Sequence, residues 1–178
     1  MNGWAEWKKD YLHGVVLIWP PDEIRSQINA LRAKYDPVSQ SYAEAHVSLT
    51  PPFLHAPSEQ DWVKLRKAAA GHARFDIAFG PVSAFGLSVI YLEVHPLERL
   101  DDLRSSLLAT GLFARALHKD FVPHMTITEG LSSVPVSQDL LTELRRSTPG
   151  GSFHCDRLAH IRPDQNFHFE VERFLELG

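Results

Sequence analysis

The sequence has little sulfur and no long apolar segment. Its single cysteine, Cys155, cannot form a disulfide within the chain, so nothing in the sequence requires an oxidising compartment, and we expect a cytoplasmic location. The longest apolar run, residues 15–19, is far too short to cross a bilayer, and residues 1–10 lack the apolar core of a signal peptide. We therefore predict no membrane span and no export.

The chain also lacks an excess of basic residues. Its formal net charge of −4 argues against broad binding to a nucleic-acid backbone, which requires a basic face, so we expect no extended nucleic-acid surface. A small phosphate-bearing substrate is compatible with this charge, because a pocket needs only local positive charge. The length suits one domain, so we expect residues 1–178 to form a single bilobal domain, with a monomer favoured.

The usual metal-binding and nucleotide-binding signatures are absent from the sequence. It has no His-Glu-x-x-His motif, no pair of closely spaced cysteines and no Gly-rich phosphate loop. Cys155 follows His154 directly, and neighbours in a strand point to opposite faces, so these two side chains cannot act together as nucleophile and base. We predict no metal ion and no cofactor.

Two short stretches, 78 positions apart, repeat the same pattern of side chains. Residues 46–50 and 124–128 each read histidine, apolar residue, hydroxyl residue, aliphatic residue, threonine. Side chains of an extended strand alternate between its faces, so each stretch directs its histidine and hydroxyls to one face and its aliphatic residues to the other. A lone histidine on a strand usually has no catalytic duty, but the same polar face built twice predicts two half-sites that meet. The side chains concerned are His46 and Ser48 in the first copy and His124 and Thr126 in the second.

The predicted elements around these stretches recur in the same order. A strand, a proline, an amphipathic helix, a loop and a motif strand occur twice, which indicates an internal duplication. We expect strands at residues 14–19, 46–50, 75–79, 82–85, 89–94, 124–128, 153–161 and 167–175, helices at residues 21–35, 58–70, 97–107 and 138–146, and a loop at residues 38–43. The predicted fold is α+β, with two pseudo-symmetric lobes of mainly antiparallel sheet backed by helices and a central cleft that carries the two motifs.

Two facing imidazoles suit the exchange of a phosphodiester. The unperturbed pKa of histidine is near 6.5, so one ring can act as a neutral base and the other as a charged acid at neutral pH. One ring removes a proton from the attacking oxygen while the other protonates the leaving oxygen. The hydroxyls of Ser48 and Thr126 can donate to the non-bridging oxygens, where charge develops in the transition state. This chemistry requires no metal.

The paired His-x-Ser/Thr motifs, their spacing and the duplicated order of elements resemble the two-histidine (2H) phosphoesterase superfamily, which includes bacterial 2′-5′ RNA ligases and 2′,3′-cyclic nucleotide phosphodiesterases. The resemblance implies that His46 and His124 are the catalytic acid and base, and that Ser48 and Thr126 hold the phosphate. The usual family assignment makes His46 the proton donor to the leaving oxygen and His124 the base that activates water. It also implies that a 2′,3′-cyclic phosphate opens to a 2′-phosphate.

This chain departs from the ligase-like members beside both motifs. Those members commonly carry an arginine shortly after the second motif, where Glu129-Gly130 stand here, and a Gly-containing turn after the first, where Pro51-Pro52-Phe53 stand here. The identity of the substrate is therefore open. Candidates for the missing positive charge are Arg115, Lys119, Arg157 and Arg162, and candidates for stacking on a base are Tyr42, Phe53 and Phe121.

These observations together predict a metal-independent hydrolase of a small phosphodiester, with a 2′,3′-cyclic phosphate of a nucleotide or RNA end as the favoured substrate. Two alternatives stay open. The first is a non-catalytic protein that binds phosphorylated nucleotides or RNA ends, and the second is a 2′-5′ RNA ligase that runs the same chemistry in reverse.

Overall fold

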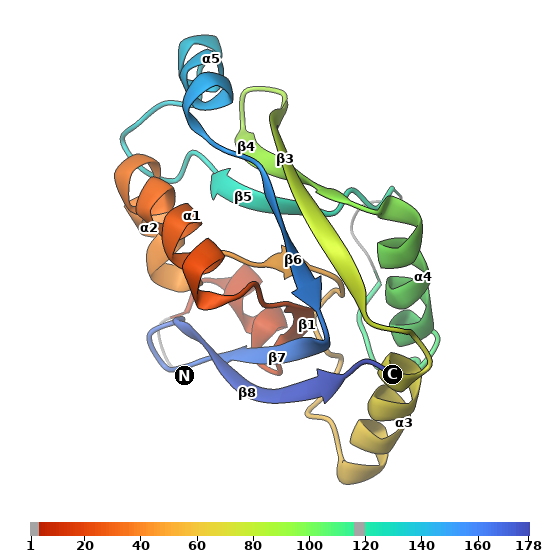
Figure 1. Cartoon of the computed structure of the whole chain (residues 1–178). Helices are drawn as coiled ribbons and strands as arrows, with labels where there is room; N and C mark the ends of the chain where they lie inside the picture. The colour runs from red at the N-terminus through yellow and green to blue at the C-terminus, as the bar shows by residue number, and fades with distance from the viewer. Residues whose placement is uncertain (1–3, 116–119) are drawn as a thin grey trace.

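Figure 1 presents a computed structural model of the chain, which describes residues 4–115 and 120–178. Eight strands form one sheet in the order β6-β3-β4-β5-β2-β1-β7-β8, and all neighbouring strands in it run antiparallel. The strands are β1 (Val15–Ile18), β2 (Val47–Ser48), β3 (Phe75–Phe85), β4 (Val89–His95), β5 (His124–Thr128), β6 (Gly151–Cys155), β7 (Arg157–Pro163) and β8 (Phe169–Glu176). The helices are the 3-10 helix η1 (Glu6–Tyr11) and the α-helices α1 (Asp22–Tyr35), α2 (Pro37–Tyr42), α3 (Glu59–Ala70), α4 (Leu97–Leu108) and α5 (Gln138–Ser147).

The order of strands is symmetric about the centre of the sheet. The motif strands β2 and β5 are the central pair, and each is flanked by the strand that opens its repeated segment, β1 or β4. β7 and β8 extend the first half, and β3 and β6 extend the second. The predicted α+β fold with two similar antiparallel lobes is confirmed, and the two motif strands lie side by side in one continuous sheet.

The helices bury one face of this sheet. Apolar side chains of α1, α3, α4 and α5 pack in a single cluster with alternate residues of the strands, including Val47 and Met125 of the motif strands. Figure 1 shows α1 and α2 at one end of the sheet and α3 and α4 at the other. A second, smaller cluster on the opposite face joins β1 and β7 to aromatic residues near η1. Between β4 and β1 this opposite face carries the polar side chains of both motifs, and we call it the front face.

The predicted helices begin and end close to where the sequence signals them. Ser58 caps α3, with its hydroxyl accepting from the Asp61 main chain and the Asp61 carboxylate accepting from the Ser58 main chain. In α1, acidic residues lie in the first turn and basic residues in the last, which suits the helix dipole.

Several predicted boundaries are wrong. The predicted loop at residues 38–43 is mostly the helix α2, which Asp36 caps by accepting from the Ser39 main chain. The expected strands 75–79 and 82–85 are one strand, β3, with a register shift between Phe79 and Val82. The first motif strand is shorter than predicted, because only Val47 and Ser48 form ladder bonds.

The expected strand at residues 153–161 is two strands in different lobes. β6 pairs with β3 at one edge of the sheet, whereas β7 pairs with β1 and β8 in the other half. Asp156 lies between them, where the chain passes from one lobe to the other. The predicted hairpin turn at residues 164–166 is confirmed, because it connects β7 to β8.

Within residues 4–115 and 120–178, no helix is both long and apolar enough to cross a bilayer. The same residues contain no group of three or more His, Cys, Asp or Glu side chains placed to share a metal ion.

Candidate active site

The two motif strands bring the four predicted site residues together on the front face. Val47 of β2 pairs with Met125 of β5, and the same antiparallel register sets each motif histidine opposite the hydroxyl residue of the other strand. The facing pairs are His46 with Thr126 and Ser48 with His124. Cβ atoms of facing residues lie about 5 Å apart and those of diagonal neighbours about 7–8 Å apart. The four side chains therefore form a rectangle, with the imidazoles at opposite corners and an approximate twofold axis between them.

Both imidazoles are oriented in the same way. Nδ1 of His46 lies 2.7 Å from the carbonyl oxygen of Glu44, and Nδ1 of His124 lies 2.7 Å from that of Val122, two residues earlier in each case. A carbonyl oxygen can only accept, so Nδ1 of each ring carries the proton and donates it. Nε2 is then left with its lone pair, available to exchange a proton with a bound group.

The surroundings keep both rings neutral while no ligand is bound. Burial lowers the pKa of His46 to about 4, and the positive charges of Arg32 and His124 act in the same direction, while the bond to Glu44 opposes them. Burial also lowers the pKa of His124, against the effect of its bond to Val122. The charge of His124 is thus one of the causes that lower the pKa of His46.

Polar residues of α1 hold the segment that presents His46. The Asn29 side chain accepts from the Ala45 main chain at 2.8 Å, and the Glu44 carboxylate accepts from Arg25 at 2.5 Å and from Asn29 at 3.3 Å. These bonds substitute for strand pairing, since β2 begins only at Val47. α1 therefore fixes the backbone immediately before His46.

A buried arginine closes the gap that the short β2 leaves beside β5. Arg32, only 3% exposed, donates to the carbonyl oxygens of Thr126 at 3.0 Å and Ala43 at 3.1 Å, and to the Ser39 hydroxyl at 3.1 Å. Burial lowers its pKa, whereas the charges of Glu129 and Asp36 raise it. Arg32 thus ties the second motif to the segment before the first.

The last threonine of each motif forms hydrogen bonds that stabilise the fold. The Thr50 hydroxyl accepts from the Val16 main chain at 3.0 Å, and the Thr128 hydroxyl donates to Asp36 at 3.3 Å and accepts from the Gly130 main chain at 3.0 Å. Both threonines are buried. Their hydroxyls therefore secure the ends of the two motifs.

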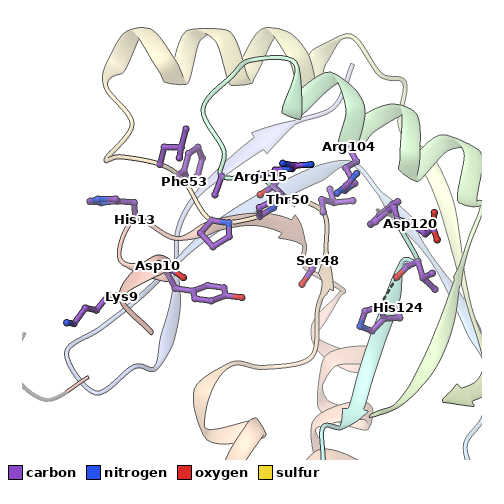
Figure 2. Close-up of a pocket in the computed structure, with 18 residues that line it drawn as sticks. Lys9, Asp10, His13, Ser48, Thr50, Phe53, Arg104, Arg115, Asp120 and His124 are labelled. Carbon is purple, nitrogen blue, oxygen red and sulfur yellow. Dashed lines mark hydrogen bonds between the residues drawn. The ribbon is translucent and has the colours of Figure 1, made fainter. Parts of the chain in front are cut away.

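A cavity of about 490 Å³ opens beside Ser48 and His124 (Figure 2). Its wall follows the chain from Ser48 to Leu54, and Arg104 and Arg115 border it on the side of α4. Residues 9–11 and His13 form the opposite border. His46 and Thr126 do not line this cavity and lie farther along the front face.

The predicted cations are only partly at this site. Arg115 lines the cavity, whereas Arg157 lies over the ring of Phe174 and Arg162 pairs with Glu172 at 2.6 Å. Lys119 lies outside the described residues. Sequence reasoning missed Arg104 and Arg32, because only the packing of α1 and α4 decides which residues those helices turn toward the site.

Of the aromatic residues predicted to stack on a base, some line the cavity and one does not. Phe121 lines the cavity, Phe53 lines it but is 2% exposed and packs on Phe113, and Tyr42 packs against Phe167 away from it. A different pair lies beside His124: Phe85, 38% exposed, is stacked on Tyr91 with ring centres 4.3 Å apart. Their rings lie 5.2 and 5.1 Å from the His124 ring.

The Cys155–His154 pair is unsuited to nucleophilic chemistry, as predicted. Cys155 is buried, which raises the pKa of its thiol to about 12, and His154 is instead paired with Asp76 at 2.8 Å.

Comparison with known sequences gives a consistent family. The sequence profile of the 2′-5′ RNA ligase superfamily matches residues 20–166. A protein of Oceanobacillus iheyensis described as a phosphoesterase is 35% identical over 168 residues, which cover 92% of this chain and 96% of that protein. A Bacillus anthracis protein with the same description is 31% identical over 167 residues, which cover 92% of this chain and 95% of that protein.

Solved structures share the fold. LigT of E. coli in complex with 3′-AMP has a TM-score of 0.54 at 18% identity, over 93% of this chain and 97% of LigT. The complex of LigT with NADP+ has a TM-score of 0.58 at 19% identity, over 93% of this chain and 98% of LigT. A Thermus thermophilus protein has a TM-score of 0.57 at 14% identity, over 91% of this chain and 96% of that protein. At such identities the solved structures show a shared fold only. The sequence profile and the sequence relatives show the family to which the chain belongs. The chain accordingly belongs to the 2′-5′ RNA ligase superfamily, the two-histidine phosphoesterases, and is a phosphoesterase of that superfamily.

Proposed function

We propose that this protein hydrolyses a 2′,3′-cyclic phosphate on a nucleotide or RNA end, with His46 and His124 as the general acid and base and with no requirement for a metal ion. The observation that carries the proposal is the matched orientation of the two rings. Each donates Nδ1–H to a carbonyl oxygen two residues earlier, so Nε2 of each ring keeps its lone pair, and both rings belong to the same face of the sheet. Two such groups supply both proton transfers of a phosphodiester hydrolysis.

In the proposed reaction, water attacks phosphorus and loses a proton to Nε2 of the basic histidine. The bond from phosphorus to the 3′-oxygen breaks, and that oxygen takes a proton from the acidic histidine, which leaves a 2′-phosphate. The hydroxyls of Ser48 and Thr126 donate to the non-bridging oxygens, whose negative charge increases in the transition state. After product release, a proton passes between the rings through solvent, and the site returns to its starting state.

Substrate binding favours protonation of the acid by solvent. Both rings have lowered pKa values in the ligand-free protein, so both are mainly neutral at pH 7. A phosphodiester anion between them stabilises an imidazolium, which raises the pKa of the pair. The complexes of E. coli LigT with 3′-AMP and NADP+ support a nucleotide as the class of ligand.

The direct test is turnover of 2′,3′-cyclic mononucleotides in the presence of a chelator. We expect conversion to the 2′-phosphate with the same rate with and without the chelator. Identification of the product by chromatography distinguishes the 2′-phosphate from the 3′-phosphate. A rate that depends on added divalent metal contradicts the metal-independent mechanism.

Joining of RNA ends is the second candidate, because the superfamily takes its name from that reaction. It uses the same acid and base, with a 5′-hydroxyl in place of water. Incubation of an RNA that ends in a cyclic phosphate with a second RNA that begins with a 5′-hydroxyl separates the two reactions by product length. Tight binding of nucleotides without conversion of any cyclic or 2′-5′-linked substrate favours a binding protein instead.

The pH dependence should reflect two coupled imidazoles with lowered pKa values. The reactive free enzyme holds one proton on the pair, and it exists between the two macroscopic pKa values. Because the pKa of His46 is about 4 and that of His124 lies below its ordinary value near 6.5, we expect a bell-shaped profile of kcat/KM with its maximum below about pH 6.5. The profile of kcat should be displaced to higher pH, because bound phosphate raises both values. A flat profile from about pH 5 to 9 contradicts two titrating imidazoles.

A further inference from the structure

The cavity beside Ser48 and His124 extends beyond the residues that would hold the reacting phosphate. From Ser48 its wall continues as far as Leu54, and residues of α4 and of the following segment close the other side. Its volume of about 490 Å³ is that of a complete small-molecule site, far more than a single phosphate group needs. The cavity therefore has space for a further part of the substrate.

Two arginines without carboxylate partners border this space (Figure 2). Arg104 is half-buried on α4 with its guanidinium carbon 4.7 Å from the ring centre of Phe121, and Arg115 is exposed. In the described part of the chain, the arginine ion pairs belong to other residues, namely Arg25, Arg157, Arg162 and Arg173. The remaining residues, 1–3 and 116–119, include no Asp or Glu.

Unpaired guanidinium groups in a cavity match a phosphate in both charge and shape. Arginine presents its donors in a planar fork that binds two phosphate oxygens at once, and such charge-assisted hydrogen bonds are about twice as strong as neutral ones. Asp120 also lines the cavity, but it is in none of the arginine ion pairs of the described residues. An anionic group of a substrate would match both arginines in charge.

The backbone that carries Arg115 lies beside the chain that leaves Ser48, away from the motif strands. The main chain of Ala114 donates to the carbonyl oxygen of Pro52 at 2.8 Å, so Arg115 starts beside Pro52, which lies four positions after Ser48. At about 3.3 Å per residue, that is up to roughly 13 Å of extended chain. His46 and Thr126 lie on the other side of Ser48, outside the cavity. The arginines thus belong to segments outside the two motif strands, and Ser48 and His124 border the same cavity.

We propose that Arg104 and Arg115 bind a second phosphate of the substrate, namely the phosphate on the 5′ side of the nucleoside that carries the reacting phosphodiester. The enzyme then prefers 5′-phosphorylated nucleotides and oligonucleotide ends to a cyclic mononucleotide that has a 5′-hydroxyl. The identity of the reacting group in this inference rests on the proposed function. The position of the second phosphate rests on the cavity and its two arginines.

The kinetic test compares a 2′,3′-cyclic mononucleotide with a 5′-hydroxyl, the same nucleotide with a 5′-phosphate, and a dinucleotide that ends in the cyclic phosphate. We expect the added phosphate to raise kcat/KM about 10- to 100-fold, and the double variant Arg104→Gln/Arg115→Gln to lose most of this preference. Arg146→Gln, at an exposed position of α5, is the control and should retain it. Equal rates on the three substrates, or a preference that survives in the double variant, overturn the proposal.

A binding measurement separates this inference from the proposed activity. Adenosine 3′,5′-bisphosphate and 3′-AMP are titrated calorimetrically into the wild-type protein and the double variant. We expect the bisphosphate to bind at least about 10-fold more tightly to the wild type, and the difference to disappear in the variant. If this difference is found while no cyclic phosphate is hydrolysed, the proposed function fails and the second-phosphate site stands. Equal affinities of the two nucleotides for the wild type overturn the site, whether or not hydrolysis occurs.

Discussion

Replacing His46 or His124 by alanine should lower kcat/KM for a 2′,3′-cyclic nucleotide by about 10²–10⁴-fold, because each change removes one of the two proton transfers. The kcat/KM of the double variant should be little lower than that of the less active single variant, since an acid and a base that act in one step do not contribute independently. Initial rates over a range of substrate concentrations measure the effect. A single variant that keeps the wild-type rate contradicts the proposed acid-base pair.

The control for this experiment is His154→Ala. His154 is an exposed histidine on the edge strand β6, paired with Asp76, and its loss should leave the rate unchanged. Circular dichroism and thermal unfolding of all variants show whether a lost rate reflects lost structure.

The same two variants can assign the roles of the rings. A substrate whose leaving group is a nitrophenolate needs no proton from the enzyme at that oxygen. The variant that lacks the acid should therefore regain most of its rate on such a substrate, whereas the variant that lacks the base should not. The family resemblance implies that His46 is the acid, although burial lowers its pKa to about 4 in the ligand-free protein. Rescue of His46→Ala supports the family assignment, and rescue of His124→Ala reverses it.

Replacing Asp36 by alanine should reduce the free energy of unfolding by about 3–4 kcal/mol, because a fully buried carboxylate that organises several main-chain groups is removed. Its Oδ2 accepts from the main chain of Glu129 at 2.8 Å and of Leu131 at 3.4 Å, and its Oδ1 accepts from the Ser132 hydroxyl at 2.7 Å. It also caps α2. Without it, these donors lose their acceptor. Urea denaturation followed by circular dichroism gives the difference.

Two further variants test this account of Asp36. Asp36→Asn keeps the shape of the side chain but turns an NH₂ group toward N–H donors, so it should also be strongly destabilised. Asp101→Ala, at an exposed position of α4, should change stability by less than about 0.5 kcal/mol. Equal stability of Asp36→Asn and the wild type contradicts the importance of these hydrogen bonds.

The contribution of Asp36 should also depend on pH. Burial raises its pKa, but the hydrogen bonds from Ser132, Glu129, Ser39 and Leu131 outweigh burial, and the pKa lies below its ordinary value. A carboxyl with a lowered pKa in the folded state stabilises the fold fully above the pKa of the unfolded chain, near 3.9, and loses that effect as the pH falls through the folded value. The stability difference between the wild type and Asp36→Asn should therefore be constant near neutral pH and shrink below about pH 4.

The motif strands and several helices could be predicted from the sequence because simple local rules apply there. Alternation of side chains along a strand put His46 and Ser48 on one face, and the same rule applied to the second motif. The hydrophobic stripes of α3 and α4 are regular, and Ser58 is a recognisable cap. Local patterns of this kind follow from the geometry of the helix or strand itself, so they can be recognised without knowledge of the tertiary structure.

Other features depend on contacts between distant segments. α2 has a polar sequence without an apolar stripe, and its only local signal is Asp36 followed by Pro37 at the first helical position. The division of β6 from β7 follows from their pairing with different lobes, which no local pattern encodes. Arg32 and Arg104 are ordinary helix residues in the sequence, and only the packing of their helices turns one toward the motif strands and the other into the cavity.

The approximate twofold axis between β2 and β5 has a consequence for the direction of catalysis. In the proposed reaction, the two oxygens on opposite sides of the phosphorus meet the same kind of imidazole and the same kind of hydroxyl, so the four central residues alone distinguish poorly between an entering and a departing group. In the proposed reaction, the choice between cleavage and joining rests with the parts of the protein that break the symmetry, such as the arginine-lined cavity and the Phe85–Tyr91 pair beside His124. Relatives with the same four central residues could thus evolve opposite preferences by changing only these flanks.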